Sequence, residues 1–228
     1  MKRTLCLIIL IPIANLLHSQ NLFLNQKGSF ADDKDVAIQE NTRMRLALHG
    51  GYSYQVAKIS DEVPAEDREH VKKLKSGYHL GADFSYFITE TSGINMKYNY
   101  FNSSHEIINI IKNEISIDFI GPGYALRLQN YSKTNALFMC MSIGYMGYTN
   151  KGYGGQIKGN TFGTALDIGY DIGIAKNVAL GLQFSMLSGS LKEFKITRNG
   201  HTETVELEKG QYEGLGRIDL TIGLRFNF

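Results

Sequence analysis

The histidines are the first side chains to consider as catalytic or metal-binding groups, because imidazole titrates near neutral pH and binds metals. Those beyond the first 20 residues are scattered, without an HxxxH zinc spacing: His49, His70, His79, His105 and His201. His201 stands beside the hydroxyl of Thr202, but the pair directly follows Asn199-Gly200, a turn signal. The spacing therefore predicts no metal site, no catalytic group and no cofactor.

Charged residues form a second candidate set, because eleven of them occupy alternate positions within apolar stretches. Six are basic and five are acidic, so their charges nearly cancel. The set comprises Arg43, Arg45, Asp83, Lys97, Asp118, Arg127, Asp167, Asp171, Arg217, Asp219 and Arg225. These charges could pair with one another if the strands that carry them enclose a common interior.

The end of the chain shows this alternation most clearly. Within 214–228, polar residues and glycine alternate with six apolar residues: Ile218, Leu220, Ile222, Leu224, Phe226 and Phe228. A period of two puts all six on one face of a β-strand, which no helix could do. The same period predicts seven further strands, at 43–55, 78–87, 93–102, 115–128, 136–148, 162–173 and 178–188. Each is long enough to cross a bilayer at a tilt.

The strand at 115–128 changes phase at Gly121-Pro122-Gly123. We predict a β-bulge there, which would return Tyr124 to the face begun by Ile115. With this bulge, Asp118 shares a face with the other charges.

The connections between the predicted strands alternate in length. Long connections (56–77, 103–114, 149–161 and 189–213) alternate with short ones (88–92, 129–135 and 174–177). Outer-membrane barrels have short periplasmic turns and long extracellular loops, and an even strand number returns both ends to the periplasm. The predicted fold is therefore all-β, an eight-stranded antiparallel up-and-down transmembrane β-barrel.

The charges decide which face of the strands meets lipid. No position on the more apolar phase carries a charge, and a Lys or Arg facing lipid near the bilayer midplane costs roughly 2–4 kcal/mol. A soluble lipocalin-like barrel would instead turn its apolar face inward. Glycines such as Gly81, Gly169 and Gly181 on the charged phase suit a narrow lumen better than a solvated exterior. Eight strands enclose room only for side chains, so we predict an ion-paired, plugged lumen, with a narrow porin-like channel as the alternative.

The first residues are typical of an export signal. Lys2 and Arg3 precede an apolar run, and Ser19 offers a small residue for cleavage. We predict a cleaved signal peptide at 1–19, a periplasmic N-terminal segment at 20–42 and a barrel at 43–228. Removing the signal takes two of 24 basic residues and leaves 22 against 22 acidic ones, so no basic surface indicates nucleic acid. Cys140 is then the only cysteine, which excludes an internal disulfide.

The strand count, the alternating connections and the ending Leu224-Arg225-Phe226-Asn227-Phe228 make 43–228 resemble a known family. It is similar to the small eight-stranded outer-membrane β-barrels of Gram-negative bacteria, of the outer-membrane protein A and X type. The resemblance implies that Leu224, Phe226 and Phe228 form a C-terminal signal read by the barrel assembly machinery. It also implies residence in the outer membrane, in contact with lipid and lipopolysaccharide. A peptidoglycan-binding domain is not expected after the last strand.

The expected role is that of a non-enzymatic monomer whose barrel anchors extracellular loops for surface interaction or envelope integrity. A protruding hairpin around Asn199-Gly200, predicted to continue the last two strands outward, could bind an extracellular protein by its edge. The first alternative is the channel. The second is a lipid A-modifying enzyme, as some relatives of this size are. Such enzymes need a His, Ser and acid set facing the membrane, whereas His49 and His79 fall on the lumen phase here.

Overall fold

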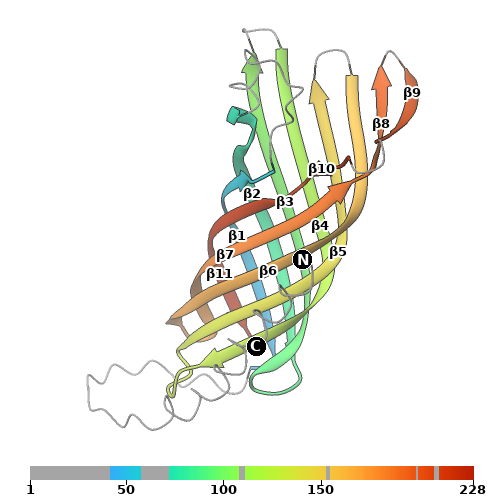
Figure 1. Ribbon diagram of the computed structural model, residues 1–228. Coiled ribbons are helices and arrows are strands. Elements are labelled where there is room, and N and C mark those ends of the chain that lie inside the picture. Colours follow the sequence, from blue (N-terminus) through green and yellow to red (C-terminus); the bar gives the residue numbers. More distant parts are fainter. Residues whose placement is uncertain (1–41, 58–71, 108–110, 153–154, 199, 208–210) are drawn as a thin grey trace, which may run out of the picture. The chain divides into compact units, whose positions relative to one another are not determined.

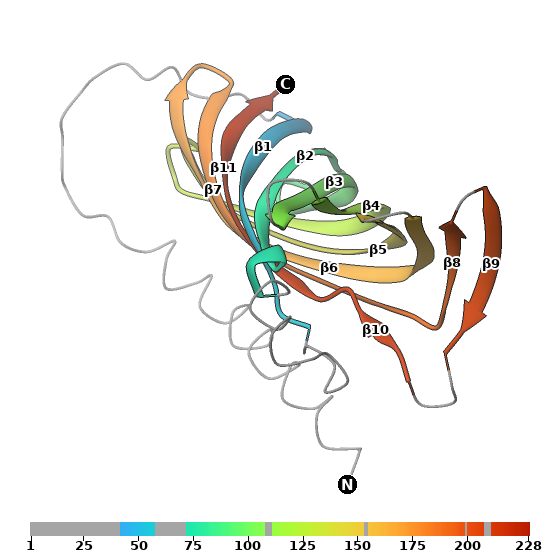
Figure 2. The same ribbon diagram turned by 90° about the horizontal axis from the view of Figure 1, so that it is seen from above.

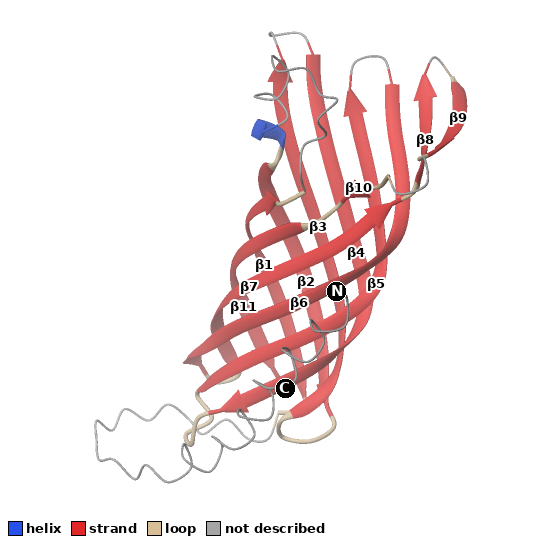
Figure 3. Ribbon diagram, viewed as in Figure 1, coloured by secondary structure: helices blue, strands red, loops and turns tan. Residues whose placement is uncertain are grey.

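The computed structural model describes residues 42–57, 72–107, 111–152, 155–198, 200–207 and 211–228. The predicted signal peptide at 1–19 and all but the last residue of the predicted periplasmic segment at 20–42 lie outside these residues. Within the described ranges, no helix is both long enough and apolar enough to cross a membrane. Strands dominate these ranges, and residues 72–74 are helical (Figure 3).

Eight strands close into an antiparallel ring (Figure 1). They are β1 (Met44–Gln55), β2 (Ser76–Phe87), β3 (Ser92–Ile107), β4 (Ile111–Gln129), β5 (Asn135–Gly152), β6 (Gly155–Ala175), β7 (Val178–Leu191) and β11 (Arg217–Asn227). Each pairs with the next, and β11 pairs with β1 over a continuous register in which Leu224 faces Leu48. The ring leaves no unpaired edge within the barrel. The predicted eight-stranded antiparallel barrel is confirmed.

The outer wall of this ring is apolar. Large hydrophobic side chains point outward from all sides, and many are half exposed, for example Leu80 at 59%, Met141 at 61% and Leu220 at 58%. Alternate residues point inward and are buried. A continuous apolar belt of this kind would be unstable in water but is what a bilayer requires, because a closed barrel satisfies its backbone groups internally.

The predicted bulge in β4 is wrong. The register between β3 and β4 continues without a shift from Lys97 opposite Gly121 to Met96 opposite Pro122, and the pairing with β5 resumes beyond them in the same register. Gly121 lies opposite Gly144, and a Cβ on Gly121 would lie 2.6 Å from the Cα of Gly144. Because two glycines allow this close approach, the strands tighten and need no extra residue. Consequently β4 keeps one phase throughout, and Asp118 points out of the barrel.

The short connections, between β2 and β3, β4 and β5, and β6 and β7, lie at one end of the ring, together with the C-terminal residue (Figure 1). At this end the backbone nitrogen of Met44 donates to the carbonyl of Phe228 at 2.8 Å. The three predicted short connections therefore share one end of the ring. Two of the predicted long connections, 103–114 and 149–161, are wrong, because β3 runs to Ile107, β4 begins at Ile111, β5 runs to Gly152 and β6 begins at Gly155. In an outer-membrane barrel the short-turn end faces the periplasm.

At the opposite end the wall continues well beyond the ring. With 21 residues, β6 is roughly 70 Å long at about 3.3 Å per residue, whereas about 9–11 residues cross a bilayer. The predicted hairpin is present as β8 (Glu193–Arg198) and β9 (His201–Glu206), with Gly200 at a φ of 80° in its turn. It does not continue β7 and β11, however. The hairpin bends away from β7, which pairs with the short strand β10 (Glu213–Gly214), and β8 pairs with the outer part of β6 (Figure 2).

Candidate functional site

Ion pairs cross the lumen between strands that are not neighbours. Arg45 on β1 donates from Nε to Asp171 Oδ2 on β6 at 3.0 Å, and Arg225 on β11 lies 3.5 Å from the same carboxylate. Arg225 also donates to the side-chain oxygen of Gln183 at 3.4 Å. All four side chains are buried, so their charges are neutralised by one another and not by bulk solvent.

A second cluster lies around Lys97 on β3. Its ammonium group is 3.4 Å from Asp83 Oδ1 on β2 and 3.1 Å from Asp167 Oδ1 on β6. His49 Nε2 lies 3.0 Å from the other oxygen of Asp83, and Gln183 donates to Asp167 at 3.2 Å. Lys97 therefore ties two carboxylates on opposite walls together.

A third cluster joins β11 to β3. Arg217 Nε lies 3.3 Å from Asp219 Oδ1, and its Nη2 donates to the side-chain oxygen of Asn99. Asn99 in turn donates to the second oxygen of Asp219 at 3.2 Å. Arg217 Nη1 also donates to the carbonyl of Ile117 at 3.3 Å, which closes the lumen from wall to wall.

Serine, histidine and aspartate meet in this third cluster, but not as a catalytic triad. The Ser53 hydroxyl donates to Asp219 at 2.6 Å and lies 2.9 Å from His79 Nδ1, so the serine stands between the other two. In a triad the histidine stands between the acid and the serine. The other nitrogen of His79 is occupied by the Thr221 hydroxyl at 3.0 Å, and Ser53 and His79 are fully buried. The set is structural in its geometry.

Glycines make room for these groups. A Cβ on Gly181 would lie 2.6 Å from Arg225 Cζ and 2.7 Å from Asp171 Oδ1. A Cβ on Gly81 would lie 2.4 Å from the ring of His49. The glycines of the lumen phase thus set the space in which the ion pairs fit.

An apolar plug, which the sequence reasoning missed, lies above the ion pairs towards the long-loop end. It is formed by buried side chains from five strands and two connections: Leu74, Phe101, Ile115, Ile117, Phe119, Met146, Ala165, Leu187, Leu191 and Leu215. The sequence analysis, with its predicted bulge in β4, had placed Ile115, Ile117 and Phe119 on the outer face of the barrel. A signal was nevertheless present, because Phe101, Met146 and Leu187 fall on the lumen phase of their strands without any bulge.

The lumen is also filled at the short-turn end. The guanidinium of Arg45 stacks on Phe138 at 4.0 Å, and that of Arg127 stacks on Phe87 at 3.8 Å. Phe87 and Phe138 belong to a buried apolar cluster that also contains Ala125 and the free thiol of Cys140. Arg127 is buried like the paired charges but has no ion pair among the described residues.

Nine of the eleven predicted lumen charges are buried inside the ring: Arg45, Asp83, Lys97, Arg127, Asp167, Asp171, Arg217, Asp219 and Arg225. Arg43 is exposed at the short-turn end, one residue before β1 begins. Asp118 was misplaced by the predicted bulge and lies on the outer face. In the C-terminal set, Leu224 and Phe228 are 42% and 53% exposed on the outer wall, with Phe226 half-buried beside them.

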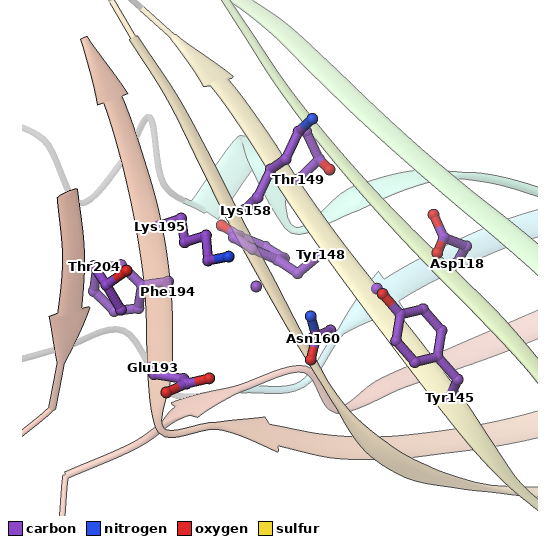
Figure 4. A pocket seen from close by; sticks show the side chains of 12 residues that line it. Asp118, Tyr145, Tyr148, Thr149, Lys158, Asn160, Glu193, Phe194, Lys195 and Thr204 are labelled. Carbon is purple, nitrogen blue, oxygen red and sulfur yellow. The ribbon is translucent and has the colours of Figure 1, made fainter. Parts of the chain in front are cut away.

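A second region of interest is a cavity of about 350 Å³ on the outer face of the extension. Lys158 and Lys195 are cross-strand partners on β6 and β8, and Asp118 and Glu193 line the cavity as well. Figure 4 shows Lys195 and Glu193 on one side and Asp118 and Tyr145 on the other. No ion pair within 4 Å joins these charges in the described part of the chain. Tyr145, which itself lines the cavity, lies opposite Phe162, so an aromatic pair adjoins it.

Among the described residues, no group of three His, Cys, Asp or Glu side chains lies close enough together to bind a metal ion.

The ring, its apolar outer wall and its filled interior define a small outer-membrane β-barrel.

No protein-family model matches the chain, and no curated protein matches it. Solved structures that share the fold include the following three. Neisserial surface protein A aligns with a TM-score of 0.55 at 10% identity, over 81% of this chain and 97% of its own. A major outer membrane protein of Thermus thermophilus aligns with 0.54 at 7% identity, over 81% and 99%. OprG of Pseudomonas aeruginosa aligns with 0.52 at 12% identity, over 84% and 99%. At these identities the likeness establishes the fold and not the activity.

Proposed function

We propose that this chain is a non-enzymatic, non-conducting barrel of a Gram-negative outer membrane, which anchors an extracellular sheet for surface interaction or envelope integrity. Export would depend on the signal peptide predicted at 1–19, and insertion on Leu224, Phe226 and Phe228 at the end of the last strand. One observation carries the proposal: the lumen is filled with paired charges and apolar side chains, while β4, β5, β6 and the β8–β9 hairpin extend well past the ring.

The filled lumen favours an anchor over a channel. An ion would have to displace Arg45 from Asp171, or Lys97 from Asp83 and Asp167, where all five side chains are buried. It would then meet the plug, where Ile117 and Phe119 are fully buried. Breaking a buried pair costs about 3–5 kcal/mol, which is a large barrier to conduction.

A lipid A-modifying activity is disfavoured by the placement of the histidines. His49 and His79 are buried in the lumen, away from the lipid-facing wall where such a substrate would lie. The mass spectrum of lipid A from a deletion strain tests this directly. A lipid A species that disappears with the gene and returns with it would overturn the non-enzymatic assignment.

Two features of the extension suit contact with other molecules. Lys158 and Lys195 line the same cavity as Tyr145, whose cross-strand partner is Phe162, and aromatic rings on the outer wall of a membrane barrel are favoured at the level of the lipid headgroups. The phosphates of lipopolysaccharide are the anions available at that level. The second feature is β9, which ends the sheet and pairs only with β8 among the described strands, so its outer edge could accept a strand from an extracellular protein.

A complementation experiment tests the proposed role without a known partner. A strain lacking the gene receives the wild-type chain, or a variant in which a short Gly-Ser turn replaces residues 193–206. Because the hairpin lies outside the ring, we expect the variant to assemble at wild-type levels but to fail to restore resistance to detergent or surface attachment. Full restoration by the variant would contradict the proposal. A Lys158→Gln, Lys195→Gln variant separates the contribution of the cavity from that of the strand edge.

A further inference from the structure

The two lysines of the outer cavity are brought together by a change of register where the chain runs from β7 into β8. Between its pairing with β7 and its pairing with β8, β6 contributes four residues (159–162), whereas the chain opposite contributes five (190–194). One extra residue reverses the side to which the following residues point, as in a β-bulge. Leu191 therefore faces the plug, whereas Lys195 faces outward beside Lys158. In the phase of β7, Lys195 would point inward instead.

Lys158 and Lys195 form a like-charged pair. They are direct cross-strand partners, an arrangement that destabilises a sheet. In the described part of the chain, no carboxylate oxygen lies within 4 Å of either ammonium group. An anion bound between the two groups would remove the repulsion. Phosphate suits them, because each ammonium group can donate to a separate oxygen. The pair therefore indicates a ligand that carries a phosphate.

The wall beside the cavity indicates where this ligand lies. Tyr145 and Phe162 are cross-strand partners on the outer wall, and Phe162 is 87% exposed, so its ring needs lipid around it. Lys158 lies four residues nearer the long-loop end of β6, roughly 13 Å away at about 3.3 Å per residue. The lysines therefore stand beyond the edge of the hydrocarbon, at the height of the lipid headgroups.

The cavity also contains acceptors that a bare phosphate would leave unused. Asp118 lies opposite Gly147, and a Cβ on this glycine would collide with the Asp118 carboxylate and touch the ring of Tyr145. The missing side chain thus leaves room for the carboxylate beside the ring. Glu193 lines the other side of the cavity (Figure 4). Carboxylates accept hydrogen bonds and repel phosphate, so they select a ligand that also presents O–H or N–H groups. A phosphorylated sugar presents both kinds of group.

We propose that this cavity binds the phosphorylated glucosamine headgroup of lipopolysaccharide, an inference that rests on the proposed outer-membrane location. Lys158 and Lys195 donate to the phosphate. Asp118 and Glu193 accept hydrogen bonds from the hydroxyl and amide groups of the sugar, and Tyr145 packs against its ring. The volume of about 350 Å³ lies within the range of about 300–1,000 Å³ that is usual for small-molecule sites. The acyl chains lie along the apolar outer wall of the barrel.

Native mass spectrometry of the mature barrel in detergent tests this site with three probes. They are phosphorylated lipid A, lipid A without its phosphates, and phosphatidylglycerol, which is anionic but has no phosphorylated sugar. The double variant Lys158→Gln, Lys195→Gln should bind phosphorylated lipid A about tenfold or more weakly than wild type, because both charged donors are lost. The matched control Lys72→Gln, Lys73→Gln removes two exposed charges from the β1–β2 connection and should bind like wild type.

The specificity for a phosphorylated sugar is tested separately. Asp118→Asn, Glu193→Gln should weaken binding of lipid A about three- to tenfold and leave binding of phosphatidylglycerol unchanged. Lipid A without phosphates should bind wild type no better than phosphorylated lipid A binds the double lysine variant.

Two results would overturn the proposal. One is equal binding of phosphorylated lipid A by wild type and the double lysine variant. The other is equal binding of phosphorylated lipid A and phosphatidylglycerol by wild type, which would indicate a general anion-binding surface. Neither result affects the proposed anchor, which fails instead if the wild-type barrel conducts ions or if the variant without the hairpin restores function. The two failures are therefore distinguishable.

Discussion

The lumen and the extracellular extension are built from the same strands but use their charges in opposite ways. In the lumen, charged side chains such as Lys97 and Asp167 are at most 1% exposed and lie within 3.1 Å of each other. In the extension, Lys158, Lys195 and Glu193 are exposed and form no ion pair with one another. A charge buried inside the ring is costly without a partner. Outside the ring, solvent surrounds each charge, and exposed pairs contribute little. Stability therefore resides in the ring, and the groups free to bind other molecules reside in the extension.

Deleting Phe228 should have the largest effect, because it acts on whether the ring forms at all. Phe228 exchanges backbone hydrogen bonds with Met44 at 2.8 and 3.0 Å, where the last strand closes on the first. We expect heat-modifiable, protease-resistant barrel in outer membranes to fall severalfold. Deleting Lys209, in the connection between β9 and β10 and outside the described residues, should have much less effect. Equal amounts of assembled barrel in the two deletion variants would show that Phe228 is not part of a signal required for assembly.

Removing one partner of a lumen pair should cost about 3–5 kcal/mol of unfolding free energy. Asp167→Ala leaves Lys97 with one carboxylate, and Arg225→Ala leaves Asp171 with only Arg45. The matched control is Lys73→Ala, an exposed site, for which we expect less than about 0.5 kcal/mol. Urea unfolding of the refolded barrel measures all three. If their midpoints coincide, the lumen charges are solvated and the contrast between the two regions is lost.

Ile117→Ala and Asp118→Ala test the phase of β4. Ile117 is fully buried in the plug, so its truncation should cost about 2–5 kcal/mol. Asp118 points outward and has no ion pair among the described residues, so its truncation should cost less than about 0.5 kcal/mol. If urea unfolding shows a larger loss of stability for Asp118→Ala than for Ile117→Ala, β4 contains the bulge at Gly121-Pro122-Gly123 and Asp118 lies in the lumen.

The smallest effect is expected from Gly200→Ala in the hairpin turn. Gly200 has a φ of 80°, and nothing in the described structure lies within 4 Å of an added Cβ, so the substitution adds backbone strain of about 1–2 kcal/mol and no clash. Hydrogen exchange of β8 and β9 should become faster while that of β1 to β7 is unchanged. Faster exchange in the ring as well would mean that the hairpin supports the barrel.

Within the membrane the fold could be predicted from the sequence, because a lipid-facing wall and a crowded lumen impose strict alternation. All eight strands of the ring were found this way. Beyond the membrane both faces of a strand meet water, so the alternation fades. For that reason the prediction began β6 at residue 162, whereas the strand begins at Gly155. The pairing of β8 with β6 was missed for the same reason.

The candidate site was predicted only in part, and the failures have physical causes. The sequence analysis placed the side chain of Asp118 in the lumen because Gly121-Pro122-Gly123 suggested an extra residue in the strand. In the structure, Gly121 and Gly144 instead let the backbones of β4 and β5 approach each other closely. Alternation shows which residues face the lumen but not how far along the axis each one lies. The partners of Arg45 and Lys97 on β6, and the separation of the apolar plug from the ion pairs, therefore required the three-dimensional structure.

Single-channel recording in planar bilayers tests the central claim, that the lumen is sealed, most directly. Refolded wild-type barrel should insert without producing conductance steps, because the ion pairs around Asp171 and Asp167 and the plug around Phe119 occlude the path. An Arg45→Ala, Arg225→Ala, Phe119→Gly variant, which removes groups from both obstructions, should show steps if it folds, and this establishes that insertion is detectable. Stable, ohmic steps from the wild-type chain would contradict the account and make the barrel a channel.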